Sequence, residues 1–352
     1  MESAINRTLI IRLSSIGDVI LASPLIRLLR KHFPAAQVDF LVKSEYAELV
    51  RYNPNLSAVL ELGPSAGTKH LRDLRERLKG ARYDLIIDLQ GNLRSFFLRL
   101  NNARQVLVVK KRRLARFFLV NFKWDVYPSA PPIALRYLEI VKHLGIADDG
   151  AGLEVHVPPK ILDQVRKRLN EAGLHQNGVL VGLCPGAKHA TKQWLWERFA
   201  ELAILLIKEE DMKVVLFGGK HDEMLCGSIE ERVLQETGKR SAILNFAGSF
   251  SLLETSVAMD FCDVVVANDT GLLHLAAARK KRVVGIYGPT VKEFGFFPYG
   301  MESKVLERKG LYCRPCTNIG GATCPEGHFR CMKEITVDEV FKAVRSLFAV
   351  PA

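Results

Sequence analysis

The chain has 352 residues, of which 48% are hydrophobic and 25% charged. These are ordinary values for a folded globular protein, so the composition excludes wholesale disorder, and the length suffices for roughly two domains. Fifty Lys and Arg residues against 38 Asp and Glu give a formal net charge of +12. This surplus favours anionic partners such as phosphorylated substrates, acidic lipid headgroups or nucleic acid.

The N-terminus reads as a first strand. Residues 8–11 are a short β-rich run between Arg7 and Arg12, with no cleavage-like site after it, so a signal peptide is not indicated. No apolar stretch approaches the ~20 uncharged residues that span a bilayer. We therefore expect a cytoplasmic protein.

Short Val/Ile/Leu-rich runs alternate with helical periods through the first half of the chain. The expected strands are 9–13, 38–42, 84–88 and 105–109, and the expected helices are 18–32, 68–79 and 91–100. Runs as apolar as 85–87 are typical of parallel strands that are buried on both faces.

The same alternation resumes after residue 152. The expected strands are 179–184, 213–217, 263–267 and 282–287, and the expected helices are 195–209, 222–236 and 271–279. A polar helix at 161–171 links the halves, and an amphipathic helix at 336–348 ends the chain. The pattern predicts two doubly wound α/β domains with parallel sheets, at 1–165 and 166–335. The segment 336–352 is expected to pack back on the first domain.

Ligands of such sheets bind beyond the carboxyl ends of the strands, where helix N-termini present free N–H groups. The first junction of this kind is Arg12–Val19, where Gly17 permits a tight turn before Asp18. Asp18 suits two roles, helix capping and general base toward a sugar hydroxyl. The junction lacks the GxGxxG pattern, which argues against a nicotinamide or flavin dehydrogenase.

Two more junctions lie in the second half. The loop 185–194 carries Thr191 and Lys192, whose hydroxyl and ammonium groups suit a diphosphate, although the spacing is not that of a Walker A loop. An ordinary polar loop is the alternative there. In Asp269-Thr270-Gly271 the chain passes from strand to helix, and His274 lies one turn beyond Thr270. Backbone N–H groups at that helix start would meet phosphate, whereas the alternative is an Asp cap and a buried histidine.

Two features lie outside these junctions. The basic run Lys110–Arg113 with Arg116 is followed by Phe117 and Phe118, which suits a membrane surface, RNA or a solvated segment. No nucleic-acid-binding module is recognised, so we expect no nucleic-acid partner. Four cysteines are grouped near the C-terminus, and in a cytosolic protein they would hold a structural metal or stay reduced thiols. They are Cys313, Cys316, Cys324 and Cys331.

Together these motifs resemble glycosyltransferase family 9, the ADP-heptose:lipopolysaccharide heptosyltransferases, and the second type most closely. The resemblance spans nearly the whole chain and is carried by collinear motifs in the family's order: Arg12–Asp18 with Ile20 and Pro24, Asp88–Asn92, Pro185–Ala187, Lys192–Trp194, Asn268–Gly271 with His274, and Gly285–Thr290. It implies the GT-B fold, in which two Rossmann-like domains face each other across a cleft.

The resemblance also implies roles for single residues. Asp18 would be the general base, with Ser14, Gly17 and Arg94 near the acceptor. Lys192 would stabilise the leaving diphosphate. The remaining donor contacts would be Thr191, Glu223, Asp269, Thr270, Gly271 and His274. The cysteine loop is similar to one found late in heptosyltransferases of the second type, and a zinc or iron bound there would be structural.

The activity that the resemblance implies is inverting transfer of heptose from ADP-L-glycero-D-manno-heptose to the inner core of lipopolysaccharide, with no cofactor required. The expected partners are this donor, an anionic lipopolysaccharide-core acceptor and the cytoplasmic face of the inner membrane as a peripheral contact. Three alternatives stay open: a protein (autotransporter) heptosyltransferase, a relative using another nucleotide sugar, and an inactive nucleotide-binding scaffold.

Overall fold

The structure is a computed structural model, and it describes residues 5–63, 67–174 and 178–348. The chain forms two compact units. Unit 1 comprises Met1–Arg112 and Pro131–His156, and unit 2 comprises Arg113–Ala130 and Val157–Ala352. The division therefore falls earlier than the expected boundary at 165/166, and the first unit is interrupted by an excursion that belongs to the second.

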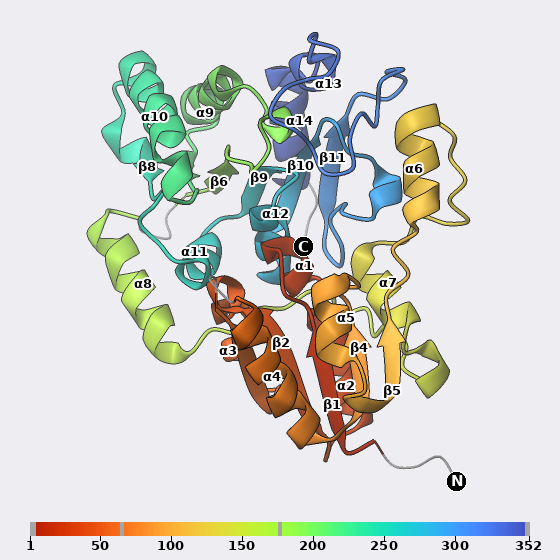
Figure 1. Cartoon of the computed structure of the whole chain (residues 1–352). Helices are drawn as coiled ribbons and strands as arrows, with labels where there is room; N and C mark the ends of the chain where they lie inside the picture. Colours follow the sequence, from red (N-terminus) through yellow and green to blue (C-terminus); the bar gives the residue numbers. More distant parts are fainter. Residues whose placement is uncertain (1–4, 64–66, 175–177, 349–352) are drawn as a thin grey trace. The chain divides into compact units, whose positions relative to one another are not determined.

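Unit 1 is built on a parallel sheet with the strand order β3-β2-β1-β4-β5 (Figure 1). Its strands are β1 (Arg7–Ile11), β2 (Gln37–Lys43), β3 (Ala58–Leu62), β4 (Tyr83–Asp88) and β5 (Ala103–Val108). Its helices are α1 (Ile16–Ile20), α2 (Ser23–His32), α3 (Glu48–Arg51), α4 (Thr68–Ala81), α5 (Leu93–Arg99) and α7 (Ile133–Glu139).

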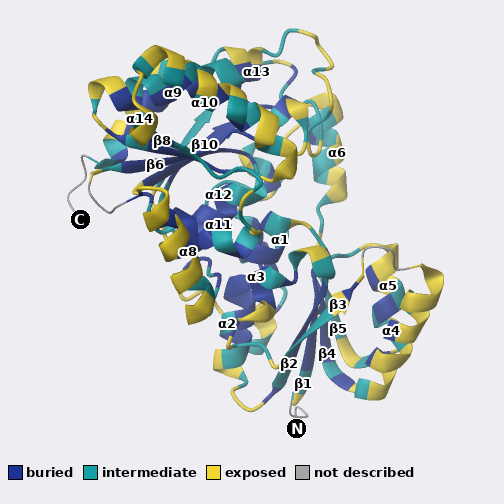
Figure 2. Cartoon of the chain, turned by 90° about the vertical axis from the view of Figure 1, so that its left-hand side faces the viewer, coloured by how far each residue is buried: buried dark blue, intermediate teal, exposed yellow. Residues whose placement is uncertain are grey.

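The central strands of this sheet are covered on both faces. Leu9, Ile10 and Ile11 of β1 are fully buried, as are Leu85, Ile86 and Ile87 of β4. Figure 2 shows these strands dark blue between helices with yellow outer faces. The continuous apolar runs in the sequence thus correspond to central parallel strands, as expected.

The expected helix 18–32 is two helices in the structure. α1 ends at Ile20, and α2 begins at Ser23 with Pro24 in its first turn. Because proline has no N–H, it could not donate to the Ile20 carbonyl in a continuous helix, whereas the first turn of a new helix tolerates it.

Unit 2 has a parallel sheet with the order β11-β10-β9-β6-β7-β8. Its strands are β6 (Leu180–Cys184), β7 (Lys213–Leu216), β8 (Ile243–Asn245), β9 (Val264–Asn268), β10 (Arg282–Tyr287) and β11 (Ser303–Glu307). Its helices are α6 (Arg113–Phe122), α8 (Pro159–Glu171), α9 (Trp196–Glu209), α10 (Glu223–Thr237), α11 (Leu252–Met259), α12 (Gly271–Ala278), α13 (Arg330–Lys333) and α14 (Val337–Phe348).

The C-terminal helix α14 belongs to the core of unit 2. Its buried side chains Val340, Phe341, Val344 and Leu347 pack with apolar residues of α9 and of the sheet in one cluster. The apolar stripe of this helix is thus buried within the second unit.

Each sheet contains a point at which the strand order reverses. In unit 1 the chain runs from β1 outward to β3 and then returns to β4 on the other side of β1. In unit 2 it runs from β6 outward to β8 and returns to β9 on the other side of β6. Such reversals separate the two neighbouring loops at the carboxyl ends of the strands and are where α/β sheets bind ligands. None of the described helices is long and apolar enough to cross a membrane.

Candidate active site

The reversal point of unit 1 joins the loops that follow β1 and β4. Arg12 donates from Nη1 to the Leu89 carbonyl at 2.5 Å. The Gln90 side-chain oxygen accepts from the backbone N–H groups of Leu13 and Ser14 at 3.0 and 3.3 Å. The two predicted motifs 12–18 and 88–92 are thus one hydrogen-bonded site, although about 77 residues separate these partners in the chain.

The loop after β4 is itself fixed by a buried carboxylate. Asp88 is fully buried and accepts from the backbone N–H groups of Gln90 and Gly91 at 2.9 and 2.8 Å. It also accepts from the Ser95 hydroxyl at 2.8 Å and from Arg99 Nε at 3.0 Å. Both carboxylate oxygens of Asp88 thus accept hydrogen bonds that shape this turn. The turn thereby holds Gln90 against the loop after β1.

Asp18 divides its two carboxylate oxygens between the start of α1 and the side chains of Arg12 and Tyr137. It is the third residue of α1, and its Oδ2 accepts from the backbone N–H and hydroxyl of Ser15 at 3.2 and 2.9 Å, which caps the helix. Its Oδ1 faces Arg12 Nη2 at 2.5 Å and the Tyr137 hydroxyl of α7 at 3.4 Å. One oxygen therefore holds the helix start, while the other faces the Arg12 guanidinium and the Tyr137 hydroxyl of the same unit.

Burial and charge act on Asp18 in opposite directions. Burial by itself would raise the pKa of Asp18, but the Arg12 cation and the hydrogen bonds from Arg12 and Ser15 outweigh it and lower the pKa below the usual Asp value. Burial likewise raises the pKa of Tyr137, so its hydroxyl stays protonated. Asp18 is thus held as a carboxylate at neutral pH.

The other residues predicted for unit 1 differ in their placement. Gly17 is a buried residue of α1, and Ser14 contributes its backbone N–H to Gln90. Arg94 is exposed in the first turn of α5. No role for Arg12, Gln90 or Tyr137 follows from the sequence patterns alone. Arg12 and Gln90 belong to quoted motifs, whereas nothing in the sequence near Tyr137 signals a site.

The reversal point of unit 2 brings together the loops after β6 and β9. Lys192 Nζ lies 2.7 Å from Asp269 Oδ2, and both side chains are largely buried. Thr290, after β10, donates its hydroxyl to the same carboxylate oxygen at 2.6 Å. Asn268 accepts from the Trp194 backbone N–H at 3.1 Å and donates to the Pro185 carbonyl at 2.7 Å. These two hydrogen bonds join the loop after β6 to the end of β9.

Thr191 is bound to the cysteine-rich loop. Its hydroxyl donates to the Gly321 carbonyl at 3.1 Å and accepts from the Gly321 N–H at 2.8 Å. The neighbouring Gly320 has φ +100°, and a Cβ there would lie 2.8 Å from His189 Cβ. The hydroxyl that we expected to meet a phosphate is therefore engaged within the chain, where it fixes the turn Ala190–Lys192 that carries Lys192.

The start of α12 presents polar groups with unused capacity. Thr270 is the N-cap residue, and its Oγ1 is buried without a hydrogen-bond partner among the described residues. Gly271 begins the helix, so its N–H is among those that a helix leaves unpaired at its start. His274 is 1% exposed, with its ring 6.4 Å from that of Phe296. A buried hydroxyl beside free N–H groups is the chemistry that an anion needs.

Glu223 lies outside this group. It is the first residue of α10 and is exposed, and its carboxylate lies against Gly248, where a Cβ would come within 2.0 Å of Oε1. Gly248 has φ +71° and donates its N–H to the Gly218 carbonyl. Glycine at 248 therefore leaves the room that the Glu223 side chain occupies.

The cysteine-rich loop gives no support to a metal site. No group of three or more His, Cys, Asp or Glu side chains within the described residues is arranged to hold a metal ion. The four thiols are free, and the Cys313 Sγ lies 3.8 Å from His328 Nε2. Burial raises the pKa of Cys331 to about 11 and also raises the pKa of Cys313 and of Cys316.

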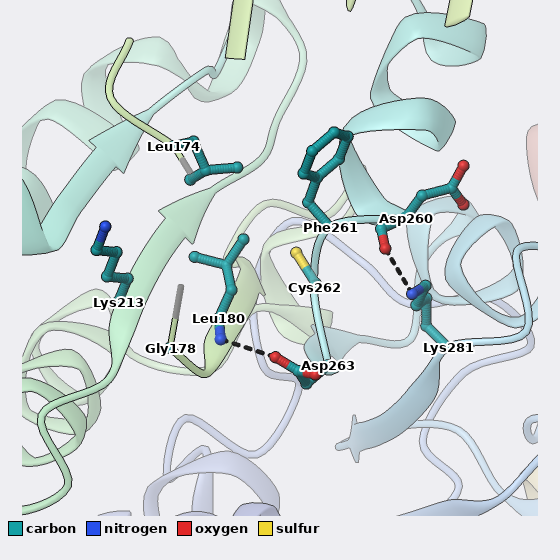
Figure 3. Close-up of a pocket in the computed structure, with 9 residues that line it drawn as sticks. All are labelled: Leu174, Gly178, Leu180, Lys213, Asp260, Phe261, Cys262, Asp263 and Lys281. Carbon is teal, nitrogen blue, oxygen red and sulfur yellow. Dashed lines mark hydrogen bonds between the residues drawn. The ribbon is translucent and has the colours of Figure 1, made fainter. Parts of the chain in front are cut away.

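A cavity of about 270 Å³ opens at the opposite edge of the unit 2 sheet, where β6, β7, β9 and β10 begin (Figure 3). Its polar groups already serve the fold: Lys281 Nζ donates to the Asp260 carbonyl at 2.6 Å, and Asp263 accepts from the Leu180 N–H at 2.9 Å. The loops that carry Lys192 and Asp269 leave the other ends of these strands, so this cavity is separate from the candidate site.

Sequence comparison identifies the family that shares these motifs. The sequence model described as Glycosyltransferase family 9 (heptosyltransferase) matches residues 71–326, which is more than half of the chain. A lipooligosaccharide heptosyltransferase 2 from Campylobacter jejuni is 26% identical over 334 residues, with 94% of this chain and 95% of the relative covered.

Solved structures show the same fold. A family 9 glycosyl transferase from Veillonella parvula superposes with a TM-score of 0.82 at 23% identity, with 99% of this chain and 98% of that chain covered. The heptosyltransferase WaaC of E. coli, solved with ADP-2-deoxy-2-fluoro heptose, gives a TM-score of 0.66 at 21% identity, with 97% and 99% covered. The expected GT-B class, with two parallel-sheet α/β units, is confirmed.

Proposed function

Since the chain belongs to glycosyltransferase family 9, the heptosyltransferases, we propose that it transfers heptose from ADP-L-glycero-D-manno-heptose to the inner core of lipopolysaccharide. The proposal includes inversion at the anomeric carbon and an anionic lipopolysaccharide-core acceptor. It places the protein in the cytoplasm, in peripheral contact with the inner membrane. Curated heptosyltransferase relatives and a solved relative that holds an ADP-heptose analogue support this choice of donor and acceptor.

The observation that carries the proposal is the group formed by Lys192, Asp269 and Thr270 in unit 2. An ammonium group paired with a carboxylate lies at the reversal point of the sheet, next to a helix start whose buried hydroxyl has no hydrogen-bond partner among the described residues. A diphosphate can take over the Lys192 cation, and Asp269 is then released to accept from sugar hydroxyls. The helix N-terminus adds positive potential where the leaving ADP develops charge.

Asp18 is proposed to act as the general base. As a carboxylate it can take the proton from the attacking acceptor hydroxyl, while the anomeric carbon exchanges its bond to the ADP oxygen for a bond to the acceptor oxygen. Arg12 keeps Asp18 ionised and oriented. Lys192 and the N–H groups at Gly271 stabilise the departing diphosphate. This route needs no metal, because fixed cations and dipoles supply the positive charge.

The remaining predicted residues complete the proposal. Thr191 positions Lys192 through its bonds to Gly321, and His274 and Glu223 are assigned to the donor side by the family resemblance alone. Ser14, Gly17 and Arg94 are assigned to the acceptor side, where the exposed Arg94 guanidinium can pair with a carboxylate or phosphate.

The test is product analysis by mass spectrometry with purified protein and synthetic ADP-heptose. We expect a truncated lipopolysaccharide-core acceptor to gain one heptose unit, and an autotransporter protein acceptor to gain none. ADP-glucose and UDP-sugars serve as alternative donors. Gain of mass on the protein acceptor alone, or with another nucleotide sugar alone, would replace the proposed reaction with one of these relatives.

The first variant to measure is Asp18→Asn. We expect transfer to fall by about 10²–10⁴-fold, the usual contribution of a general base, while ADP binding changes by less than about twofold. The matched control is Asp73→Asn, which changes an exposed aspartate of α4 in the same unit. Equal turnover in Asp18→Asn and the control would remove Asp18 as the base, and ADP binding without turnover in the wild type would indicate an inactive scaffold.

A further inference from the structure

Helix α6 and the residues after it expose an aromatic cluster. Phe117, Phe122 and Trp124 are 52%, 50% and 62% exposed, and Leu114 on the first turn is 75% exposed. The Phe122 and Trp124 ring centroids lie 5.4 Å apart, and those of Phe117 and Phe122 lie 5.9 Å apart. Contiguous exposed apolar surface of this kind marks an interaction site in a soluble protein.

The opposite face of α6 is anchored to unit 2, which fixes the direction of the aromatic face. The Arg116 guanidinium lies 5.0 Å from the centroid of the fully buried Phe294 ring, and Leu119, one turn further, is 7% exposed. At the helix end Lys123 Nζ donates to the Val120 and Pro315 carbonyls at 2.6 and 2.8 Å. Leu114 and Phe117, spaced by three residues, therefore share the outer face.

The chain segment that leads into and carries this cluster is strongly basic. Residues 110–126 contain six Lys and Arg and a single acidic residue, Asp125. Two of these cations are held by uncharged groups, since Arg116 packs on a ring and Lys123 binds carbonyls. Arg112 pairs with Glu139 at 3.7 Å. A partner of this surface must therefore offer apolar groups to the aromatic side chains and negative charges to the neighbouring Lys and Arg residues.

A bilayer of anionic phospholipid has this composition, because acyl chains lie directly beneath a layer of negative headgroups. Trp and Phe favour that boundary, and neighbouring Lys and Arg are attracted to acidic lipids. A second copy of the chain fits less well, because two such surfaces would bring like charges together. RNA also fits less well, because base stacking uses open ring faces and these rings pack on one another.

We propose that α6 and residues 123–126 form a membrane-docking surface that binds anionic bilayers through Phe117, Phe122 and Trp124. The site lies outside the proposed sugar-transfer residues and extends the proposed function only by giving the membrane contact a place in the fold. Vesicle binding and transfer to a water-soluble core oligosaccharide are measured separately, so failure of one leaves the other standing.

The experiment is co-sedimentation of the full chain with vesicles of phosphatidylcholine alone and with 30% phosphatidylglycerol. We expect binding to the anionic vesicles, weakened by salt, and little binding to the neutral ones. Trp124 serves as a reporter: its fluorescence should shift to shorter wavelength on anionic vesicles, and the shift should be lost in Trp124→Phe. Equal binding to both vesicle types, or a shift that persists in Trp124→Phe, would overturn the proposal.

Paired variants separate the apolar and the charged contributions. Phe117→Ser with Trp124→Ser should lower vesicle partitioning at least about tenfold, against a control of Tyr52→Ser with Met224→Ser, two exposed residues elsewhere. Lys110→Gln with Arg113→Gln should lower it roughly 25-fold, at about fivefold per charge, against Lys167→Gln with Lys342→Gln.

Melting temperatures confirm that each variant is folded. Equal losses in the test and control pairs would contradict a docking surface at α6. Dimerisation in solution that the Phe117→Ser and Trp124→Ser pair abolishes would also contradict it. RNA binding by a protein that does not bind vesicles would contradict it as well.

Discussion

Single residues in this protein divide their functional groups between structure and chemistry. Asp18 uses one oxygen to cap α1 and the other to pair with Arg12. The spacing Ser15–Asp18 is a local capping pattern, so the sequence predicts it. The pairing with Arg12 depends on the turn between them, and Tyr137 approaches from a helix that follows more than a hundred residues later.

The Arg12 contact leads to a prediction about pH. Asp18 has a lowered pKa, so we expect the proposed base to remain ionised, and activity to persist, below the pH at which an ordinary aspartate is protonated. In Arg12→Gln, burial is offset only by the hydrogen bonds from Ser15, so the pKa of Asp18 rises and the acidic limb of kcat/KM should move to higher pH.

The pH profile of Arg12→Gln is compared with that of Arg104→Gln, which removes an exposed cation paired with Asp84. Arg12→Lys keeps the charge and should return the limb toward its wild-type position. An unshifted limb in Arg12→Gln, with the melting temperature preserved, would show that Arg12 serves only the loop after β4.

Lys192 is the second residue whose role can be measured directly. Lys192→Gln removes the proposed charge-assisted contact with the diphosphate, which would be worth about 1.5–3 kcal/mol, so we expect ADP to bind roughly 10- to 150-fold more weakly in calorimetric titration. The control is Lys188→Gln, an exposed cation of the same loop. Equal affinities in the two variants would mean that the loop, and not the Lys192 ammonium, determines binding.

At the scale of secondary-structure elements, α14 shows how a cap and an ion pair act together. Glu339 accepts from the Thr336 backbone N–H at 2.8 Å, Thr336 caps the helix in return, and Arg308 also contacts the Glu339 carboxylate. The hydrogen bond from Arg308, with the cap bonds from Thr336, outweighs burial and lowers the pKa of Glu339 to about 2.

We therefore expect Glu339→Gln to lower the free energy of unfolding by about 1 kcal/mol at neutral pH. Because the folded-state pKa is depressed, this contribution is present above the unfolded value of about 4.5 and is lost as the pH falls toward 2. Urea titrations at pH 7 and pH 3 measure the difference, with Asp338→Asn, an exposed pair partner of Lys342, as the control. A difference that grows on acidification would contradict the ion-pair explanation.

Some strands have sequence patterns that are too weak to predict them. The strands β3, β8 and β11 were not predicted, whereas β1, β4, β6 and β9 were, within a few residues. The missed strands lie at the edges of their sheets, where β3 and β11 are only partly buried. An edge strand needs less apolar surface, so its sequence lacks the continuous Val/Ile/Leu run of a central strand.

At the scale of the whole molecule, the described residues of each unit form an apolar cluster of their own. One cluster is formed by residues of β1, β2, β4 and neighbouring helices, and another by unit 2 residues from β6 to α14. Since the proposed ADP contacts lie in unit 2, we expect scanning calorimetry to resolve two unfolding transitions, of which ADP raises only one. At a hundred times its Kd, ADP adds about 2.7 kcal/mol to the unit that binds it.

Lys192→Gln provides the control for this measurement, because the ADP-dependent shift should shrink in proportion to the lost affinity. A single transition that ADP moves as a whole would contradict two independently melting units. Two transitions that both move would contradict the assignment of the ADP contacts to unit 2 alone.

The sequence by itself determined the alternation of strands and helices, the position of each polar loop and the residue types that suit a diphosphate and a base. These depend on short-range periodicity and on turn chemistry, which local stretches of chain encode. The tertiary structure decided which loops become neighbours: the strand order places Lys192 beside Asp269 and Leu89 beside Arg12. It also assigned residues 113–130 to the second unit and α14 to its core. Such contacts join residues far apart in the chain, and they follow from which apolar faces bury one another, a property of the whole fold that no local stretch contains.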